Sequence, residues 1–230
     1  MDLRSQDPPR AAQAAWGVLC ALREELGALH GAVVGRRRRQ GLEVLELDLC
    51  PQPVLAVVSG VGKVRAAQAA ALLVAEGATR GLFVVGVCGG LRSALVPGTL
   101  VHCTRAAQTD LAVRSDREFE SDLRLRSAWL AVAPGEQGWF LTADRPVLSL
   151  WRRLRLARAF LGPCVADMET AAAGAVAARA GVPWAALRAV TDPATGLGLA
   201  SFKLHFPSQA GRCADTLPAL LRGLGERGGG

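Results

Sequence analysis

Hydrophobic positions along the chain fall into short continuous runs that alternate with segments of helical periodicity. A short apolar run bounded by Gly or Pro predicts a buried strand, whereas a longer segment with apolar residues on one face predicts a helix. On this basis we expect strands at residues 16–22, 42–49, 54–60, 80–87, 98–106, 138–144 and 183–192. We expect helices at residues 23–31, 62–78, 149–162, 170–181 and 208–224.

Alternation of strands and helices is typical of parallel sheets covered by helices on both faces. We therefore expect an α/β fold of three layers, α/β/α, with a mixed, largely parallel central sheet. No internal repeat or linker divides the chain. The expected organisation is a flexible segment at residues 1–15, a single domain at 16–224 and a disordered tail at 225–230. Residues 109–138 are polar and irregular, so we expect a long loop with one short helix there.

Composition narrows the class of protein. Half of the residues are hydrophobic and 20% are charged, which allows a substantial core and argues against disorder. The six cysteines are scattered without a CxxC motif, which favours free thiols in a reducing cytosol over disulfides or a zinc site. No apolar run is long enough to span a membrane, and the N-terminus lacks a signal-peptide pattern. We expect a cytoplasmic protein without a membrane partner.

The net charge of +7 raises the question of an anionic partner such as nucleic acid. The arginines are spread along the chain except for Arg36–Arg39, which lie between two apolar alternations and shortly before Gly41. This pattern favours a solvated hairpin tip. Aromatic residues do not alternate with the basic ones, as they would on a face that binds single strands. A small-molecule partner is therefore favoured over nucleic acid.

The candidate chemistry lies where the predicted strands end, because sheets of this kind bind ligands beyond the carboxyl ends of their strands. Two glycine-rich turns follow predicted strands, at Gly60–Lys63 and Gly86–Gly90. Acidic residues stand at the other strand ends and at the start of the Ala-rich helix: Glu24, Glu25, Asp144, Asp167, Glu169 and Asp192. If the predicted strands form one sheet, these groups converge on one edge.

Each of these features also has a purely structural explanation. The "GVGKV" turn is not a phosphate-binding P-loop, because Val57 and Val64 stand where that motif needs Gly and Ser or Thr. Glycine turns also allow close backbone packing. Cys88 has no recognisable His beside it, so a buried thiol is favoured over a nucleophile. Acids at helix starts stabilise the helix electrostatically, and Asp192 before Pro193 suits a turn.

Four segments taken together carry a family resemblance. They are "GVLCALREELGAL", "SGVGKV", "VVGVCGGL…VPGTLV" and "VADMETAAAGAVAARAGVPWAALRAVTD", in this order and spacing. With them the chain resembles the purine nucleoside phosphorylase and nucleosidase superfamily, most closely its 5′-methylthioadenosine/S-adenosylhomocysteine nucleosidase branch. The resemblance runs from about Gly17 to the C-terminal helix. Its most specific part lies between Asp167 and Asp192.

The resemblance implies cleavage of the N-glycosidic bond of a purine nucleoside, without a metal, a cofactor or a covalent intermediate. The transition state resembles an oxocarbenium ion, so the site must protonate the base, stabilise the sugar cation and direct a water. Asp192 corresponds to the acid that protonates purine N7, and Glu25 to the carboxylate that activates water. Glu169 corresponds to the carboxylate that binds the ribose hydroxyls, and Met168 would pack against the sugar.

The same resemblance implies the remaining substrate-binding residues, which are Val87, Cys88, Gly89, Val147 and Asp167. A position in the first helical turn is expected to keep Glu169 ionised, with an effect of roughly 0.3–1 kcal/mol. Asp192 must instead be able to hold a proton, which requires partial burial or nearby negative charge. Asp167 either supports the site from behind or marks a different substrate.

Two departures from the family pattern leave the substrate and the nucleophile open. Related hexameric phosphorylases carry an Arg where Val84 stands, and Arg23 lies beside two glutamates that would repel phosphate, so water is favoured as nucleophile. The aromatic residue expected shortly after Asp144 is replaced by "RPVL". A phosphorylase, a hydrolase for adenosylhopane or futalosine, and a nucleoside-binding protein without activity remain alternatives. Relatives are commonly homodimers whose partner helps to close the 5′ pocket.

Overall fold

A computed structural model describes residues 14–113, 116–193 and 198–226 of the chain. The expectations for residues 1–13 and 227–230, at the two ends, lie outside the described residues. Within the described ranges the strands are β1 (Trp16–Cys20), β2 (Val33–Arg39), β3 (Leu42–Leu47), β4 (Val54–Val58), β5 (Gly81–Gly90), β6 (Leu100–Gln108), β7 (Glu118–Glu120), β8 (Glu136–Thr142), β9 (Cys164–Asp167) and β10 (Trp184–Asp192). The α-helices are α1 (Lys63–Ala75), α2 (Leu123–Val132), α3 (Leu150–Ala159), α4 (Thr170–Arg179), α5 (Gly198–Gln209) and α6 (Leu217–Glu226). Two 3₁₀ helices are η1 (Arg23–Ala32) and η2 (Ala214–Thr216).

The strands form one mixed sheet. Parallel pairings join β4, β1, β5 and β10 in its centre, and a second parallel set joins β6, β8 and β9. Antiparallel pairings add the β2–β3 hairpin to β4 and connect β10 to β6. The end of β5 also pairs with β9, so that the sheet curls back on itself there. The expected mixed sheet is confirmed, and its curl brings the end of β9 close to the ends of β5 and β10.

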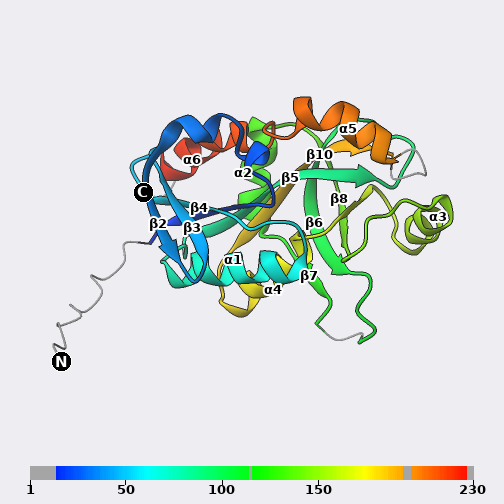
Figure 1. The fold of residues 1–230 in the computed structure, drawn as a ribbon, viewed down its shortest axis with the longest axis horizontal. Helices are drawn as coiled ribbons and strands as arrows, with labels where there is room; N and C mark the ends of the chain where they lie inside the picture. Colours follow the sequence, from blue (N-terminus) through cyan, green and yellow to red (C-terminus); the bar gives the residue numbers. More distant parts are fainter. Residues whose placement is uncertain (1–13, 114–115, 194–197, 227–230) are drawn as a thin grey trace.

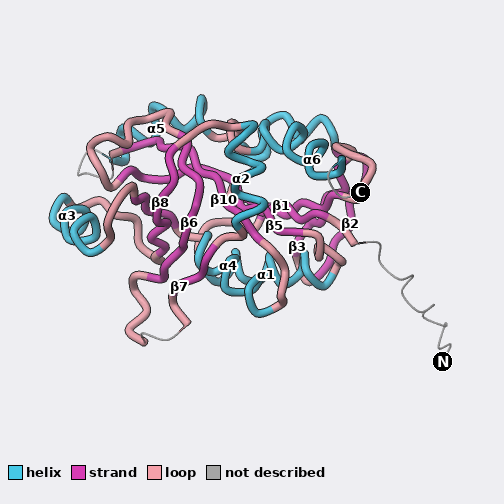
Figure 2. Tube along the Cα trace, turned by 180° about the vertical axis from the view of Figure 1, so that it is seen from behind, coloured by secondary structure: helices cyan, strands magenta, loops and turns pink. Residues whose placement is uncertain are grey.

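Helices cover the central strands on both faces, which makes the three expected layers (Figures 1 and 2). Alternate residues of one strand serve opposite layers, as the pleat requires. Leu82 and Val84 of β5 pack with α1 and α4, whereas Phe83 and Val85 pack with α2 and α6. The continuous apolar run of β5 is therefore explained by burial on both faces. Among the described residues, no helix combines the length and apolarity needed to cross a membrane.

The structure confirms one local expectation and corrects others. The short helix expected within residues 109–138 is α2, whose Leu125 and Trp129 are buried against the sheet, but the range also contains the unexpected strand β7. The start of β8 also lies within this range. Strand β9 and helix α5 were not expected, and the predicted C-terminal helix is confined to η2 and α6. The expected helix at residues 23–31 is a 3₁₀ helix interrupted at Gly27, where φ is 50°.

The hairpin around the arginine run also differs from expectation. Arg36–Arg39 lie within strand β2, and the tip is formed by Gln40 and Gly41, which both have positive φ. The arginines are not simply solvated, because Arg36 pairs with Glu43 and Arg37 pairs with Glu46 and Glu76. Much of the local positive charge is thus already matched by acids of the same protein.

Candidate active site

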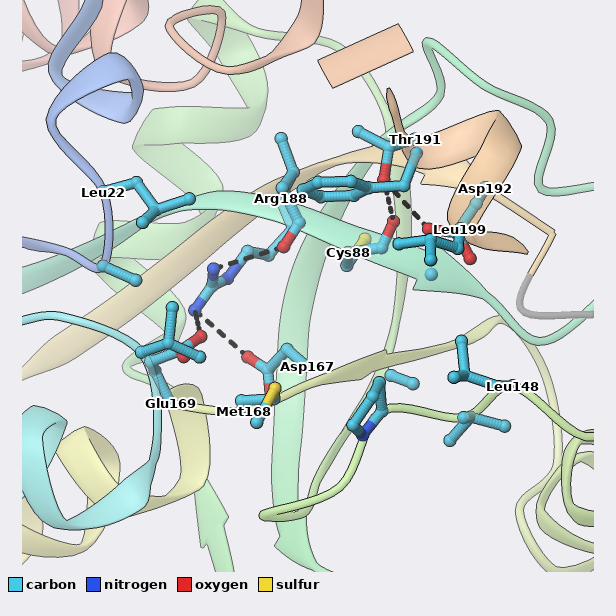
Figure 3. A pocket seen from close by; sticks show the side chains of 18 of the residues that line it. Leu22, Cys88, Leu148, Asp167, Met168, Glu169, Arg188, Thr191, Asp192 and Leu199 are labelled. Atoms are coloured by element: carbon cyan, nitrogen blue, oxygen red, sulfur yellow. Dashed lines mark hydrogen bonds and ion pairs between the residues drawn. The ribbon is translucent and has the colours of Figure 1, made fainter. Parts of the chain in front are cut away.

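A cavity of about 290 Å³ lies where β1, β5, β9 and β10 end (Figure 3). Turns after these strands and the start of α5 complete its wall. The lining residues are Ala21, Leu22, Glu25, Val61, Val87, Cys88, Gly89, Arg145, Pro146, Val147, Leu148, Ala166, Asp167, Met168, Glu169, Arg188, Thr191, Asp192, Leu199 and Phe202. The cavity contains every residue that the family resemblance assigned to catalysis or substrate binding. The fold therefore brings these residues together around one cavity.

Arg188 is the electrostatic centre of this cavity, although it lies in the apolar strand β10. Its Nη2 lies 3.2 Å from Asp167 Oδ2 and 3.2 Å from Glu169 Oε2, and its Nη1 lies 3.9 Å from Glu25 Oε1. Figure 3 shows the guanidinium extending toward Glu169 and Asp167. The side chain is 1% exposed. One buried cation is therefore shared by three buried carboxylates, and the charges of those acids raise its pKa against the effect of burial.

Glu25 is held in place by backbone amides. Its Oε2 accepts hydrogen bonds from the N–H groups of Ala21 and Leu22, at 2.8 and 2.9 Å, and its Oε1 accepts one from Val87 at 3.0 Å. Burial raises the pKa of Glu25, while Arg188 and these amides act in the opposite direction. A carboxyl group that is anchored in this way and has a raised pKa is suited to accept a proton from water.

Glu169 precedes α4 as its N-cap residue and does not cap the helix through its side chain. Its Oε1 accepts a hydrogen bond of 3.0 Å from Gly62 N–H, which belongs to the "GVGKV" turn, and its Oε2 accepts one from Arg188. Burial raises the pKa of Glu169, partly offset by Arg188. The expected contribution of the helix terminus to its ionised form stays a prediction. Arg188 and the Gly62 amide favour that ionised form against the effect of burial.

Asp167 helps to hold Arg188 in place within the buried ionic cluster. Its carboxylate accepts hydrogen bonds from Thr142 Oγ1, from Thr170 Oγ1 and from the backbone N–H of Thr170. Its side chain is completely buried. Because these three donors and Arg188 occupy the carboxylate, its oxygens have little capacity left for substrate. The geometry favours the supporting role over direct substrate binding.

Asp192 ends β10 on the side of the cavity opposite Glu169 (Figure 3). It is half-buried, and its Oδ1 accepts a 3.0 Å hydrogen bond from Thr191 Oγ1. Thr191 Oγ1 also lies 3.2 Å from the carbonyl oxygen of Cys88, which ties the end of β10 to β5. Burial raises the pKa of the Cys88 thiol well above its usual value, so this cysteine is not an activated nucleophile.

Apolar groups form most of the remaining wall. Met168 is half-buried and Val147 is buried, and both line the cavity together with Val87–Gly89. Among the predicted strand-end acids, Asp144 does not line the cavity and Glu24 is exposed. Within the described residues, no group of three or more His, Cys, Asp or Glu side chains is arranged to hold a metal ion. The cavity thus combines an apolar wall with a buried ionic cluster at one end.

Gly86 is required by this ionic cluster. Its φ of 147° is unusual for residues with a side chain, and a Cβ atom there would overlap Glu25 Oε1 and lie 2.5 Å from Arg188 Nη1. Because both side chains are fixed by several partners, they cannot move away without losing contacts.

We predict that Gly86→Ala lowers kcat by about 100-fold, because misplacing a positioned group by about 1 Å costs that much. Steady-state kinetics of base release would measure the loss. Gly41→Ala is the matched control: its φ is 81°, yet nothing lies within 4 Å of the added Cβ. It should lose stability without losing activity. Equal activity of the two variants would contradict the assignment.

A cluster of ion pairs, called the ionic clasp here, joins the start of α1 to two loops beside the cavity. Lys63 Nζ lies 2.6 Å from Asp110 Oδ1 and 3.3 Å from Asp144 Oδ2, and Asp110 Oδ2 accepts a hydrogen bond from Asp144 N–H. Partial burial alone would lower the pKa of Lys63, but the two aspartates outweigh it and raise that pKa. The clasp connects the turn that holds Glu169 with the loop that begins at Arg145.

We predict that Lys63→Met raises KM several-fold and changes kcat by less than twofold, because the residue positions the wall without lining the cavity. Removal of this partly exposed pair should cost stability by no more than about 1 kcal/mol. Lys63→Arg, which keeps the charge, should restore KM. An unchanged KM in Lys63→Met would show that the clasp does not position the loop.

Sequence reasoning missed Arg188, together with Thr142, Thr170 and Thr191. A signal for Arg188 was present, since a charged residue in the middle of "PWAALRAV" breaks an apolar run that otherwise predicts burial. Buried arginine needs anionic partners, which could have linked it to the neighbouring acids. No comparable signal marked the threonines.

The chain is similar in sequence to known nucleoside-cleaving proteins. A sequence model of the phosphorylase superfamily matches residues 16–222. The 5′-methylthioadenosine/S-adenosylhomocysteine nucleosidase of Mycobacterium bovis is 28% identical over 247 residues, covering 89% of this chain and 96% of that protein.

Solved structures show the same fold. The corresponding nucleosidase of Neisseria meningitidis, in complex with methylthio-immucillin-A, has a TM-score of 0.85 at 24% identity, covering 91% of this chain and 99% of that one. Futalosine hydrolase of Helicobacter pylori has a TM-score of 0.85 at 20% identity, covering 90% of this chain and 97% of that one. These similarities establish how the chain folds.

Proposed function

The chain belongs to the phosphorylase superfamily, and from this premise we propose that it is a hydrolase of purine nucleosides. The bond cleaved is the N-glycosidic bond, and the base is released. The preferred substrate class is a 5′-substituted adenosine of the methylthioadenosine or S-adenosylhomocysteine type, by similarity to the named relatives. The observation that carries the proposal is the convergence of Glu25, Glu169 and Asp192 on one cavity.

Each of the three acids has a different role, which follows from its surroundings. Asp192, at the end of β10, donates a proton toward purine N7 of the leaving base. Glu169 is paired with Arg188 and accepts hydrogen bonds from the ribose hydroxyls, and its negative charge faces the oxocarbenium ion. Glu25, fixed by three amides, orients a water at C1′ and accepts its proton. Met168 packs against the sugar, and Val87, Cys88, Gly89 and Val147 line the substrate site, while Asp167 keeps Arg188 in position.

Water is the nucleophile in this proposal, for an electrostatic reason. Arg145 and Arg188 are the cations among the described residues that line the cavity, and Arg188 is already shared by three carboxylates. Arg23, which is followed by two glutamates in the sequence, pairs with Glu43 and does not line the cavity. A phosphate dianion beside three buried acids would be strongly repelled. Phosphorolysis therefore has little support from the geometry.

The decisive experiment measures adenine release by the purified protein in phosphate-free buffer. Methylthioadenosine and S-adenosylhomocysteine are the first substrates, and futalosine and adenosylhopane test the other substrate classes. We expect turnover without phosphate and no acceleration when phosphate is added. A strict requirement for phosphate would make the protein a phosphorylase. Binding of all four nucleosides without cleavage would make it a binding protein.

The proposal includes a cytoplasmic homodimer. The loop after β6 exposes the apolar side chains of Leu111 and Val113, which a second copy would cover. Sedimentation analysis of the wild type and of the double variant Leu111→Asp/Val113→Asp tests this assignment. A wild-type monomer, or a dimer unaffected by both substitutions, would contradict the proposed interface.

A further inference from the structure

Helix α3 stands apart at one end of the molecule (Figure 1). Of its ten residues only Ala157 is buried, whereas α4, of the same length, buries seven. Leu156 and Phe160 pack partly against the small cluster under α3, and the Nε of Arg153 donates to the carbonyl oxygen of Leu91. These contacts attach one side of the helix to the body and leave the other side uncovered.

The uncovered side is apolar to an unusual degree. Trp151 is 80% exposed, and Leu150 and Leu154 are exposed on the same helical face. Leu148 before the helix and Leu161 after it are exposed as well. Single exposed leucines need no explanation, but a run of five large apolar side chains along one short segment marks an interaction surface. We call these residues, with Arg155 and Arg158, the α3 surface.

The same segment is strongly basic. Residues 145–166 contain five arginines and neither Asp nor Glu. Arg155 and Arg158 are exposed on the face that carries Trp151, and no ion pair is formed by either among the described residues. This differs from the β2 arginines, several of which are matched by glutamates. The α3 surface therefore combines apolar area with unneutralised positive charge.

We propose that the α3 surface docks onto an anionic lipid membrane, with α3 lying in the plane of the headgroups. A basic helix with a tryptophan and leucines on one face has the composition of an interfacial anchor. The tryptophan and leucines enter the boundary between headgroups and acyl chains, and the long arginine side chains reach back to the phosphates. A helix that lies in this plane does not need the length of a membrane span.

Other occupants fit the α3 surface less well. Two copies of the chain that met through α3 would bring Arg155 and Arg158 against each other with no acid in the segment to neutralise them. Nucleic acid would match the charge, but leucines offer no flat face for base stacking, and the segment has a single exposed tryptophan. An anionic lipid surface satisfies both the charge and the apolar area.

Docking in this manner would place the cavity next to the membrane. Leu148 belongs both to the cavity wall and to the exposed run, and α3 begins two residues later. Figure 3 shows Leu199 beside Asp192 and Leu148 below them on the same side of the view. The nucleoside site would then open close to the lipid surface, whatever nucleoside it accepts.

Co-sedimentation of the full chain with vesicles tests the proposal. We expect retention on vesicles of phosphatidylglycerol and phosphatidylcholine, little retention on phosphatidylcholine alone, and loss of retention at high salt. Arg155→Ala/Arg158→Ala should weaken partitioning about 25-fold, since each arginine near an anionic surface contributes about fivefold. Trp151→Ala should weaken it about tenfold or more, and the wild-type fluorescence should shift to the blue because Trp151 leaves water.

The controls separate this contact from general charge attraction. Arg38→Ala/Arg124→Ala removes the same charge from exposed positions on β2 and α2 and should retain binding, as should Arg155→Lys/Arg158→Lys. None of these residues lines the cavity, so turnover of soluble nucleosides should be unchanged in every variant. Equal retention on neutral vesicles, or equal losses in the control pair, would overturn the proposal. So would conversion of a dimer to a monomer by Trp151→Ala, because α3 would then be a contact between copies.

Discussion

Asp192→Asn should abolish hydrolysis while leaving the fold and substrate binding intact. The substitution keeps the size of the side chain but removes the proton that the leaving base must receive. General acid catalysis contributes typically 10²–10⁴-fold, so kcat should fall by about that factor. Single-turnover measurement of base release, with binding of the nucleoside followed by calorimetry, separates the chemical step from affinity.

The control for this prediction is Asp48→Asn, which neutralises an exposed acid outside the cavity. It should behave as the wild type. If Asp192→Asn keeps more than half of the wild-type kcat, then Asp192 is not the acid and the proposed mechanism fails. If it instead loses binding with kcat unchanged, Asp192 recognises the base without protonating it.

Arg188→Met should have the largest effect on stability. Removing the cation leaves Glu25, Asp167 and Glu169 buried without their shared partner. Loss of one member of a buried ionic cluster typically costs 3–5 kcal/mol, and we expect a loss of about this size at pH 7. Activity should also disappear, because Glu169 and Glu25 lose the group that orients them.

The pH dependence of this loss follows from the direction of the pKa shifts. Burial raises the pKa values of Glu25 and Glu169 above 4.5 in the folded protein, and removal of Arg188 raises them further. Between the unfolded and the folded pKa the native state binds more protons than the unfolded state, so the free energy of unfolding falls as pH rises. The penalty in Arg188→Met should therefore be largest at pH 7 and shrink as the pH approaches 4.5. Urea unfolding at pH 5 and pH 7 measures this difference.

Two further variants test the explanation even if Arg188→Met is poorly folded at pH 7. Arg188→Lys keeps one positive charge but loses the planar fork, so it should be intermediate in stability and still inactive. Adding Glu169→Gln to Arg188→Met removes one uncompensated charge and should recover part of the stability. A penalty that is independent of pH would mean that lost packing, and not charge, dominates the effect.

Elements that are buried on both sides could be predicted from the sequence, whereas an element that depends on its pairing partner, such as β7, could not. The strands β1, β4, β5 and β10 were predictable from the sequence. A strand that is buried on both faces of a sheet needs apolar residues at successive positions, so it appears as a continuous apolar run bounded by turns. The short helix expected within residues 109–138 is present as α2, whereas strand β7 was not predictable in this polar stretch. Strand β7 exists because β6 offers it an edge, and α2 is stabilised by Leu125 and Trp129 reaching distant strands.

In the site, too, some features were predictable from the sequence and others were not. The amino-acid sequence by itself determined the α/β class, the acids at the strand ends and, through its motifs, the family. Only the tertiary structure decided that Glu25, Asp167 and Glu169 share Arg188, because these side chains come from the turn after β1, the end of β9, the start of α4 and the middle of β10. It also showed that Glu169 is buried beside Arg188. A helix terminus is a local feature and visible in the sequence, whereas burial, which raises the pKa of Glu169, is a property of the packed molecule.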